Sequence, residues 1–214
     1  FFEDYYVLKK TVATLFELYA GIAGKRFFCR ALKGDSFYNT AINSDMTVSC
    51  NCNDNLGLGK IGDLNKQSLQ EIFFGEKANQ FRKSLAKGRL PVINCGICSD
   101  LCLIDKKLAK KYISDFKTPR SILIENTVNC NLNCIGCNRK KIYSLRQKRN
   151  MSLEELKKIS LQIKENKIEF VSYFNLGDPF FSDRIKKELE IIRKYNPKIK
   201  MGVSTNGLLL DSKE

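Results

Sequence analysis

The chain has 214 residues, of which 43% are hydrophobic and 10% aromatic, so its composition excludes a disordered protein and allows one or two folded domains. Its 37 basic and 23 acidic residues give a formal net charge of +14, which favours acidic partners, although a lysine-rich surface would also account for it. Histidine is absent, which excludes histidine acid–base catalysis and Cys/His zinc sites. No apolar stretch reaches the roughly 20 residues of a membrane helix and no signal peptide is evident, so we expect a cytoplasmic protein. Because the sequence does not begin with Met, we expect a fragment of a longer chain.

The first half of the chain predicts short helices and one hairpin between its cysteines. Apolar residues at roughly helical spacing predict an N-terminal helical segment over residues 1–26. Two β-prone runs around an Asn-Ser-Asp turn predict a hairpin over residues 39–50. A loop rich in glycine and asparagine follows, and two apolar stripes then predict short helices that end before Gly75 and Gly88.

A basic helix and then a strand–helix alternation are expected in the second half. Residues 103–117 read as a basic helix that Pro119 ends. Three strands are expected at residues 121–125, 168–174 and 199–204. One helix lies between each pair of strands, and Ser152 and Glu155 form a capping box at the start of the first. This alternation is typical of right-handed parallel crossovers, so we predict an α/β fold.

Nine cysteines fall into groups along the chain. The groups are Cys29; Cys50 and Cys52; Cys95, Cys98 and Cys102; and Cys130, Cys134 and Cys137. Grouped spacing without a secretory signal indicates metal binding before disulfides, and an odd number cannot pair completely.

A polar loop follows each of the three expected strands. The loops cover residues 129–137, 175–179 and 205–207. Parallel α/β folds place ligands at the carboxyl ends of their strands, so we expect these loops to converge on one face. Cys130, Cys134 and Cys137 supply three thiolates, whereas a cuboidal iron–sulfur cluster usually takes four. One iron would lack a protein ligand and be open to substrate; the alternative is a zinc knuckle that borrows a fourth cysteine.

These loops resemble the motifs of the radical SAM enzymes. Cys130, Cys134 and Cys137 match the C-x3-C-x2-C loop, Gly177-Asp178-Pro179 resembles the Gly-Glu-Pro motif, and Ser204-Thr205-Asn206-Gly207 resembles the third-strand motif. Gly136 stands where the family usually has an aromatic residue. The resemblance covers residues 120–210 and implies a partial (βα) radical SAM barrel of about three strand–helix units.

The resemblance also implies cofactors and a reaction. A [4Fe–4S] cluster on the three cysteines would bind S-adenosylmethionine (SAM) and cleave it reductively to a 5′-deoxyadenosyl radical, which abstracts hydrogen from a substrate. The backbone at Gly177, Asp178 and Pro179 would bind the methionyl amine. Ser204 and Asn206 would line the cofactor pocket.

The first module resembles a SPASM-type auxiliary-cluster domain, the usual companion of peptide-modifying radical SAM enzymes. The resemblance includes the hairpin before Cys50, the segments 58–64 and 68–73, Phe81-Arg82 and the closing Cys95-Gly-Ile-Cys98. It implies that Cys29, Cys50, Cys95 and Cys98 bind a second [4Fe–4S] cluster suited to electron transfer or substrate docking. Cys52 and Cys102 are unassigned: either could join this set or help to hold another cluster. A four-thiolate zinc site is the alternative.

These interpretations together give a domain organisation and a leading hypothesis. We divide the chain into an N-terminal helical segment (1–26), a SPASM-like auxiliary domain (27–102), a basic helical linker (103–119) and the N-terminal half of a radical SAM core (120–214). The leading function is a radical SAM oxidoreductase or maturase that acts on a peptide, a protein or a cell-surface building block. The alternatives are an iron–sulfur electron-transfer module without SAM turnover and a zinc-binding, nucleic-acid-associated protein.

A basic run directly follows the cysteine loop. Its members are Arg139, Lys140, Lys141, Arg146, Lys148 and Arg149. The run indicates either a solvated surface or a docking site for an acidic electron donor, such as a flavodoxin or ferredoxin, or for a phosphate-bearing substrate. No aromatic ladder accompanies it, so single-stranded nucleic acid is not favoured, and no membrane association is expected. The sequence does not identify the peptide or small-molecule substrate.

Overall fold

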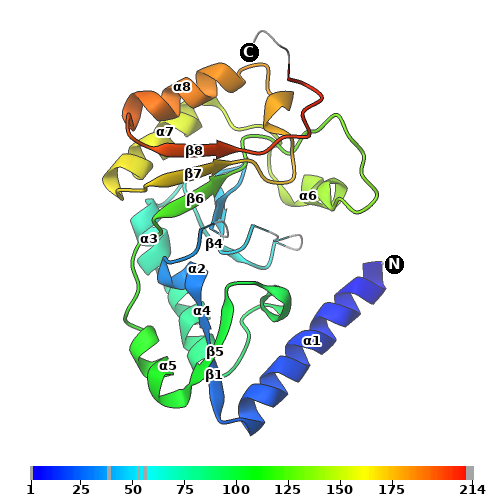
Figure 1. Ribbon diagram of the computed structural model, residues 1–214, viewed down its shortest axis with the longest axis vertical. Helices are drawn as coiled ribbons and strands as arrows, with labels where there is room; N and C mark the ends of the chain where they lie inside the picture. Colours follow the sequence, from blue (N-terminus) through cyan, green and yellow to red (C-terminus); the bar gives the residue numbers. More distant parts are fainter. Residues whose placement is uncertain (1, 38–39, 53, 55–56, 211–214) are drawn as a thin grey trace.

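In the computed structural model, six strands form a mixed sheet in the order β4-β3-β2-β6-β7-β8. Figure 1 labels β6, β7 and β8, which lie side by side in its upper part. Its strands are β2 (Ala41–Ile42), β3 (Thr47–Ser49), β4 (Lys60–Asp63), β6 (Ser121–Ile124), β7 (Phe170–Tyr173) and β8 (Lys200–Val203). β2, β3 and β4 pair antiparallel, whereas β6, β7 and β8 run parallel to one another. The protein is therefore mixed α/β with a parallel sheet.

The structure describes residues 2–37, 40–52, 54 and 57–210, without the side chains of residues 2–5. Residue 39 of the expected hairpin and residues 211–214 of the expected core lie outside this part. None of the described helices is both long and apolar enough to cross a membrane.

The sheet crosses the expected boundary at residue 119. β2 lies in the cysteine-rich segment, yet it pairs in parallel with β6, with Ala41 opposite Leu123 and Ile42 opposite Ile124. All four of these side chains are buried. The hairpin that we expected in the first module thus extends the parallel sheet of the second.

Two amphipathic helices, α7 (Leu153–Glu165) and α8 (Ile185–Tyr195), follow β6 and β7 in the chain and contact each other (Figure 1). The predicted capping box is present, because the Ser152 hydroxyl accepts from the Glu155 amide while the Glu155 carboxylate accepts from the Ser152 amide. Buried residues of both helices share one hydrophobic core with the sheet; they are Leu156, Ile159, Ile163, Ile185 and Ile192.

The N-terminal region differs from the expected helices at two places. Helix α1 (Phe2–Ile22) ends before residue 26, and β1 (Lys25–Cys29) follows it. β1 pairs antiparallel with β5 (Leu101–Asp105), so the expected helix at 103–117 is wrong in its first part and begins only as α5 (Lys106–Tyr112). The reason is a long-range contact: Phe27 is buried and lies opposite Leu103, and the strand pairing overrides local helix preference.

The remaining helices are short: four lie in the cysteine-rich first segment, one follows the fourth cysteine group, and one follows β7. They are α2 (Arg30–Lys33), α3 (Leu69–Phe74), α4 (Glu76–Ala86), the 3-10 helix η1 (Ile93–Ile97), α6 (Arg139–Leu145) and the 3-10 helix η2 (Pro179–Phe181). α3 and α4 match the two short helices expected before Gly75 and Gly88.

Helix α1 packs through its small residues. Ala13 and Ala20 are buried, and the α carbon of Ala13 lies close enough to Gly96 in η1 that a β carbon there would be 3.0 Å away. Larger apolar side chains at the helical spacing that predicted this helix, such as Leu15 and Tyr19, are instead exposed.

Candidate functional site

Three loops meet at the carboxyl ends of β6, β7 and β8. Because these strands are parallel and adjacent, the chain leaves all three at the same edge of the sheet. Hydrogen bonds between the loops confirm that they are in contact: the Asp178 amide donates to the Asn129 carbonyl at 2.8 Å, and the Asn206 side chain donates to Asn131 at 2.9 Å. The expected convergence of the loops is therefore present.

Asp178 joins the second loop to the third. Its carboxylate is 3% exposed and accepts hydrogen bonds from the Thr205 hydroxyl at 2.9 Å and from the Asn206 amide at 2.9 Å. It also accepts from the amide of Phe180 at 2.9 Å, which caps η2. The side chain therefore points into the protein and fixes the position of the third loop.

Gly177 lies directly against the loop that precedes the cysteines. A β carbon at this position would be 2.0 Å from the carbonyl oxygen of Thr127 and 2.9 Å from that of Asn129. Both neighbours are backbone atoms that a side chain could not displace cheaply, so the close approach requires glycine. Pro179, the third residue of the motif, is buried, and its carbonyl accepts a hydrogen bond from Asn126 at 3.2 Å.

The cysteine loop leaves its thiols accessible. Cys134 is exposed, Cys130 and Cys137 are half-buried, and nothing lies within 4 Å of a β carbon built on Gly136. The Cys130 sulfur accepts from the Leu132 amide at 3.4 Å and from the Asn206 side chain at 3.6 Å.

Arg139 and the third loop border the same cysteine loop. The Arg139 guanidinium donates to the Leu132 carbonyl at 2.6 Å and thereby ties α6 to the loop between the first two cysteines. Ser204 follows β8 and is exposed. Asn206 contacts Cys130, so one of the two predicted pocket residues of this loop lies at the first cysteine.

The donor set in this loop fits an iron–sulfur cluster. Thiolates are the usual ligands of such clusters, and hydrogen bonds to sulfur, like that of Asn206, are one of the means by which proteins tune them. Among the described residues, no three Cys, Asp or Glu side chains are spaced to bind a single metal ion.

Four cysteines of the first segment line a second, largely enclosed pocket. Cys29 ends β1, Cys50 follows β3, and Cys95 and Cys98 lie in and after η1. Apolar side chains surround them; they include Leu32, Phe81, Leu85 and Val92. The structure thus brings together the four thiols that we assigned to an auxiliary cluster, whereas neither Cys52 nor Cys102 lines this pocket.

Burial dominates the chemistry of these four thiols. It raises the pKa of Cys95 to about 12 and raises the pKa of Cys29, Cys50 and Cys98 above the ordinary thiol value. The negative charges that the neighbouring thiolates would carry raise the pKa of Cys50 further, in agreement with their placement in one pocket. Without a metal the pocket therefore favours neutral thiols, and metal binding would release protons.

A buried ion pair behind the site was missed by our sequence analysis. Arg146 belongs to the basic run, but its side chain is 5% exposed and donates to Glu125 at the end of β6 at 2.8 Å. Arg146 also donates to Asn43, and Asn175 of the second loop donates to the same glutamate. The signal that could have suggested this role was a lone acidic residue at the end of an otherwise apolar strand.

The basic run is consequently less of an open surface than expected. Arg146 is buried, Lys148 pairs with Glu155, and the Arg149 guanidinium lies 4.2 Å from the centre of the Tyr143 ring. Lys140 remains exposed beside the cysteine loop.

Comparison with protein-family models gave a match, which covers these loops. Residues 124–214 match the radical SAM superfamily model. This match supports radical SAM membership, and with it a [4Fe–4S] cluster and SAM-dependent radical chemistry. It includes Cys130, Cys134 and Cys137 and the loops after β7 and β8. Searches of curated proteins and of solved structures found no significant match.

The match begins at residue 124, so the cysteine-rich segment 27–102 lies outside it. The SPASM-like interpretation of that segment stays a prediction, as do the individual roles of the site residues.

Proposed function

We propose that this chain is the cluster-binding part of a radical SAM oxidoreductase or maturase, with Cys130, Cys134 and Cys137 as the ligands of a [4Fe–4S] cluster. The observation that carries the proposal is the meeting of the three motif loops at one edge of the sheet, held together by Asp178. When bound, the cluster supplies the electron for reductive cleavage of SAM.

The chain's own residues would bind and orient the cofactor. The close contact of Gly177 with the backbone of Thr127 and Asn129 fixes the loop whose carbonyls we assign to the methionyl amine of SAM. Asn206 contacts the sulfur of Cys130 and, with Ser204, would line the pocket. Asp178 positions the loops and does not contact the cofactor itself, because its carboxylate accepts hydrogen bonds from donors of the protein.

Cys29, Cys50, Cys95 and Cys98 would hold an auxiliary [4Fe–4S] cluster. Their common pocket, its apolar walls and their mutual electrostatic influence support this assignment. Such a cluster has no open iron, which suits electron transfer or substrate docking. By resemblance to SPASM-containing enzymes, the substrate would be a peptide, a protein or a cell-surface building block.

The test is reconstitution of the whole chain with iron and sulfide under anaerobic conditions, followed by dithionite and SAM. We expect iron and sulfide for two clusters and release of 5′-deoxyadenosine. Cys134→Ala should abolish the release of 5′-deoxyadenosine. Cys95→Ala should lose iron but keep part of the 5′-deoxyadenosine release. Cys102→Ala serves as the matched control. Zinc without sulfide, or equal 5′-deoxyadenosine from wild type and Cys134→Ala, would refute the proposal.

An acidic electron donor is proposed to dock beside the cysteine loop. Lys140 and Arg149 are exposed on the segment that follows the loop and carry the charge that would attract it. The double variant Lys140→Glu/Arg149→Glu should lower SAM cleavage driven by reduced flavodoxin and leave cleavage driven by dithionite unchanged. Equal loss with both reductants would show that these residues do not act through docking.

A further inference from the structure

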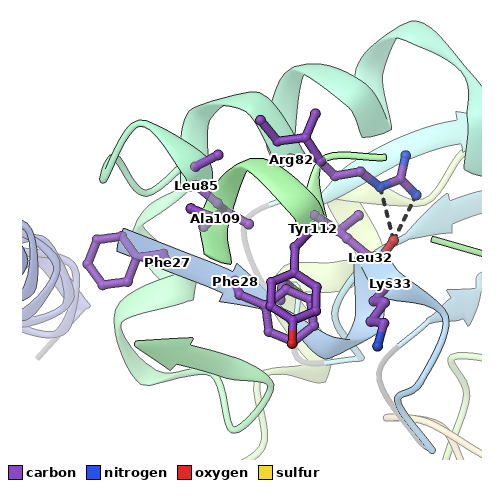
Figure 2. Close-up of a pocket in the computed structure, with 11 residues that line it drawn as sticks. Phe27, Phe28, Leu32, Lys33, Arg82, Leu85, Ala109 and Tyr112 are labelled. Atoms are coloured by element: carbon purple, nitrogen blue, oxygen red, sulfur yellow. Dashed lines mark hydrogen bonds between the residues drawn. The ribbon is translucent and has the colours of Figure 1, made fainter. Parts of the chain in front are cut away.

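Arg82 of α4 is a buried cation that has no acidic partner among the residues the structure describes. Its residue is 5% exposed, and its guanidinium donates to the Leu32 carbonyl at 2.8 and 3.0 Å, as Figure 2 shows. It also donates to the Phe73 carbonyl at 2.7 Å and to the Asn79 side-chain carbonyl at 2.9 Å, and it stacks 3.5 Å from the centre of the Phe116 ring. Every one of these partners is neutral.

A buried charge of this kind requires compensation. Removing a cation from water carries a large penalty unless an opposite charge lies nearby. The other buried arginine described above, Arg146, has such a partner in Glu125, whereas no carboxylate of the described residues pairs with Arg82. Burial lowers the pKa of Arg82 to about 10, so its side chain is still charged at neutral pH, and a thiolate at Cys29 would oppose this shift.

The cysteine pocket and Arg82 share the stretch of chain around α2. Cys29 precedes α2, and Leu32 of α2 supplies the carbonyl that accepts two of the Arg82 hydrogen bonds. Cys29, Leu32 and Leu85 line both the pocket of Figure 2 and the pocket of the four thiols. Arg82 and Cys29 therefore border one pocket, which Leu32 and Leu85 also line, and these apolar side chains leave little water to screen the interaction of the two groups.

We infer that Arg82 is the counter-charge of the auxiliary cluster and raises its reduction potential, an inference that rests on the auxiliary cluster proposed above. Four thiolates give such a cluster a net negative charge, and one electron taken from a reductant makes that charge larger. A fixed cation nearby stabilises the reduced form more than the oxidised form. Net charge and local electrostatics are among the factors that set cluster potentials.

The experiment uses the whole chain with Cys130, Cys134 and Cys137 replaced by Ala, so that the auxiliary cluster is the only one. Its midpoint potential is measured by a dithionite titration followed by electron paramagnetic resonance. Arg82→Met removes the charge. Asn79→Asp keeps the arginine but places a carboxylate on its Nη1, and Arg120→Met, at an exposed arginine paired with Glu169, is the control.

We expect equal iron and sulfide in all variants and a more negative midpoint in Arg82→Met and Asn79→Asp only. The reduced-to-oxidised ratio at the parent's midpoint should fall at least tenfold, about 59 mV for one electron. An unchanged midpoint with intact iron would overturn the role of Arg82 and leave the auxiliary cluster standing. If Arg82→Met retains no cluster, Asn79→Asp decides. Absence of iron from the parent would remove the auxiliary cluster itself and the inference with it.

Discussion

Replacing Asp178 by Asn tests whether its carboxylate holds the three loops of the site together. The substitution keeps the shape of the side chain and removes its charge. Three donors lose an ionised acceptor: the amides of Phe180 and Asn206 and the hydroxyl of Thr205. A hydrogen bond to a charged group contributes about 1.5–3 kcal/mol and a neutral one about 0.5–1.5 kcal/mol, so each donor loses roughly 1 kcal/mol. We expect the free energy of unfolding to fall by about 3 kcal/mol.

The assay is urea unfolding of the metal-free chain, read as a shift in midpoint at constant slope. The matched control is Asp183→Asn, because the side chain of Asp183 is 95% exposed and should change stability by no more than about 0.5 kcal/mol. Equal midpoints for the two variants would refute the argument that the Asp178 carboxylate is a structural link. If Asp178→Asn, but not Asp183→Asn, binds SAM more weakly, the Asp178 carboxylate also supports the proposed cofactor site.

Further outcomes follow from other contacts in the structure. Gly177→Ala places a β carbon 2.0 Å from a backbone oxygen, so we expect about 1–3 kcal/mol of destabilisation by urea unfolding, whereas Gly136→Ala, in open space, should have no such effect. Burial alone would raise the pKa of Glu155, but its lysine ion pair and serine hydrogen bonds lower it below the ordinary value. This group therefore stabilises the fold above its unfolded pKa and loses that contribution as the pH falls through the folded pKa; the stability of Glu155→Gln should decline less steeply in acid. In the metal-free chain, iodoacetamide should label exposed Cys134 first and buried Cys50 last, as mass spectrometry would show; the reverse order would contradict the burial of the four-thiol pocket.

Local patterns predicted the strand–helix units of the second half well. The Ser152 capping box, the apolar stripe behind it and the β-branched strands are all signals within one element, so they could be recognised without a partner. The pairing of β1 with β5 could not be predicted in this way, because Phe27 and Leu103 are distant in the sequence and only the folded chain brings them together. For the same reason, residues 103–105 of β5 were predicted to begin a helix.

The candidate site shows the same division. The order of the motif loops after parallel strands predicted their convergence, and the grouping of Cys29, Cys50, Cys95 and Cys98 in one pocket agrees with the ligand set proposed from resemblance. The orientation of side chains could not be predicted. The Asp178 carboxylate is buried and accepts donors of the third loop.

Arg146 illustrates why charge patterning alone was misleading. A run of basic residues in a sequence indicates a solvated or docking surface, because most arginines stay in water. This arginine instead enters the protein to meet Glu125, which no local pattern relates to it. Only the tertiary fold creates the pair.

The parallel pairing of β2 with β6 has a consequence for synthesis on the ribosome. β2 emerges roughly 80 residues before its partner, a delay of about 4–16 seconds at ordinary elongation rates. During that interval the nascent hairpin presents an unpaired edge that the finished protein covers with β6. Because β2 consists of only Ala41 and Ile42, the edge that could pair with another chain stays short until β6 is synthesised.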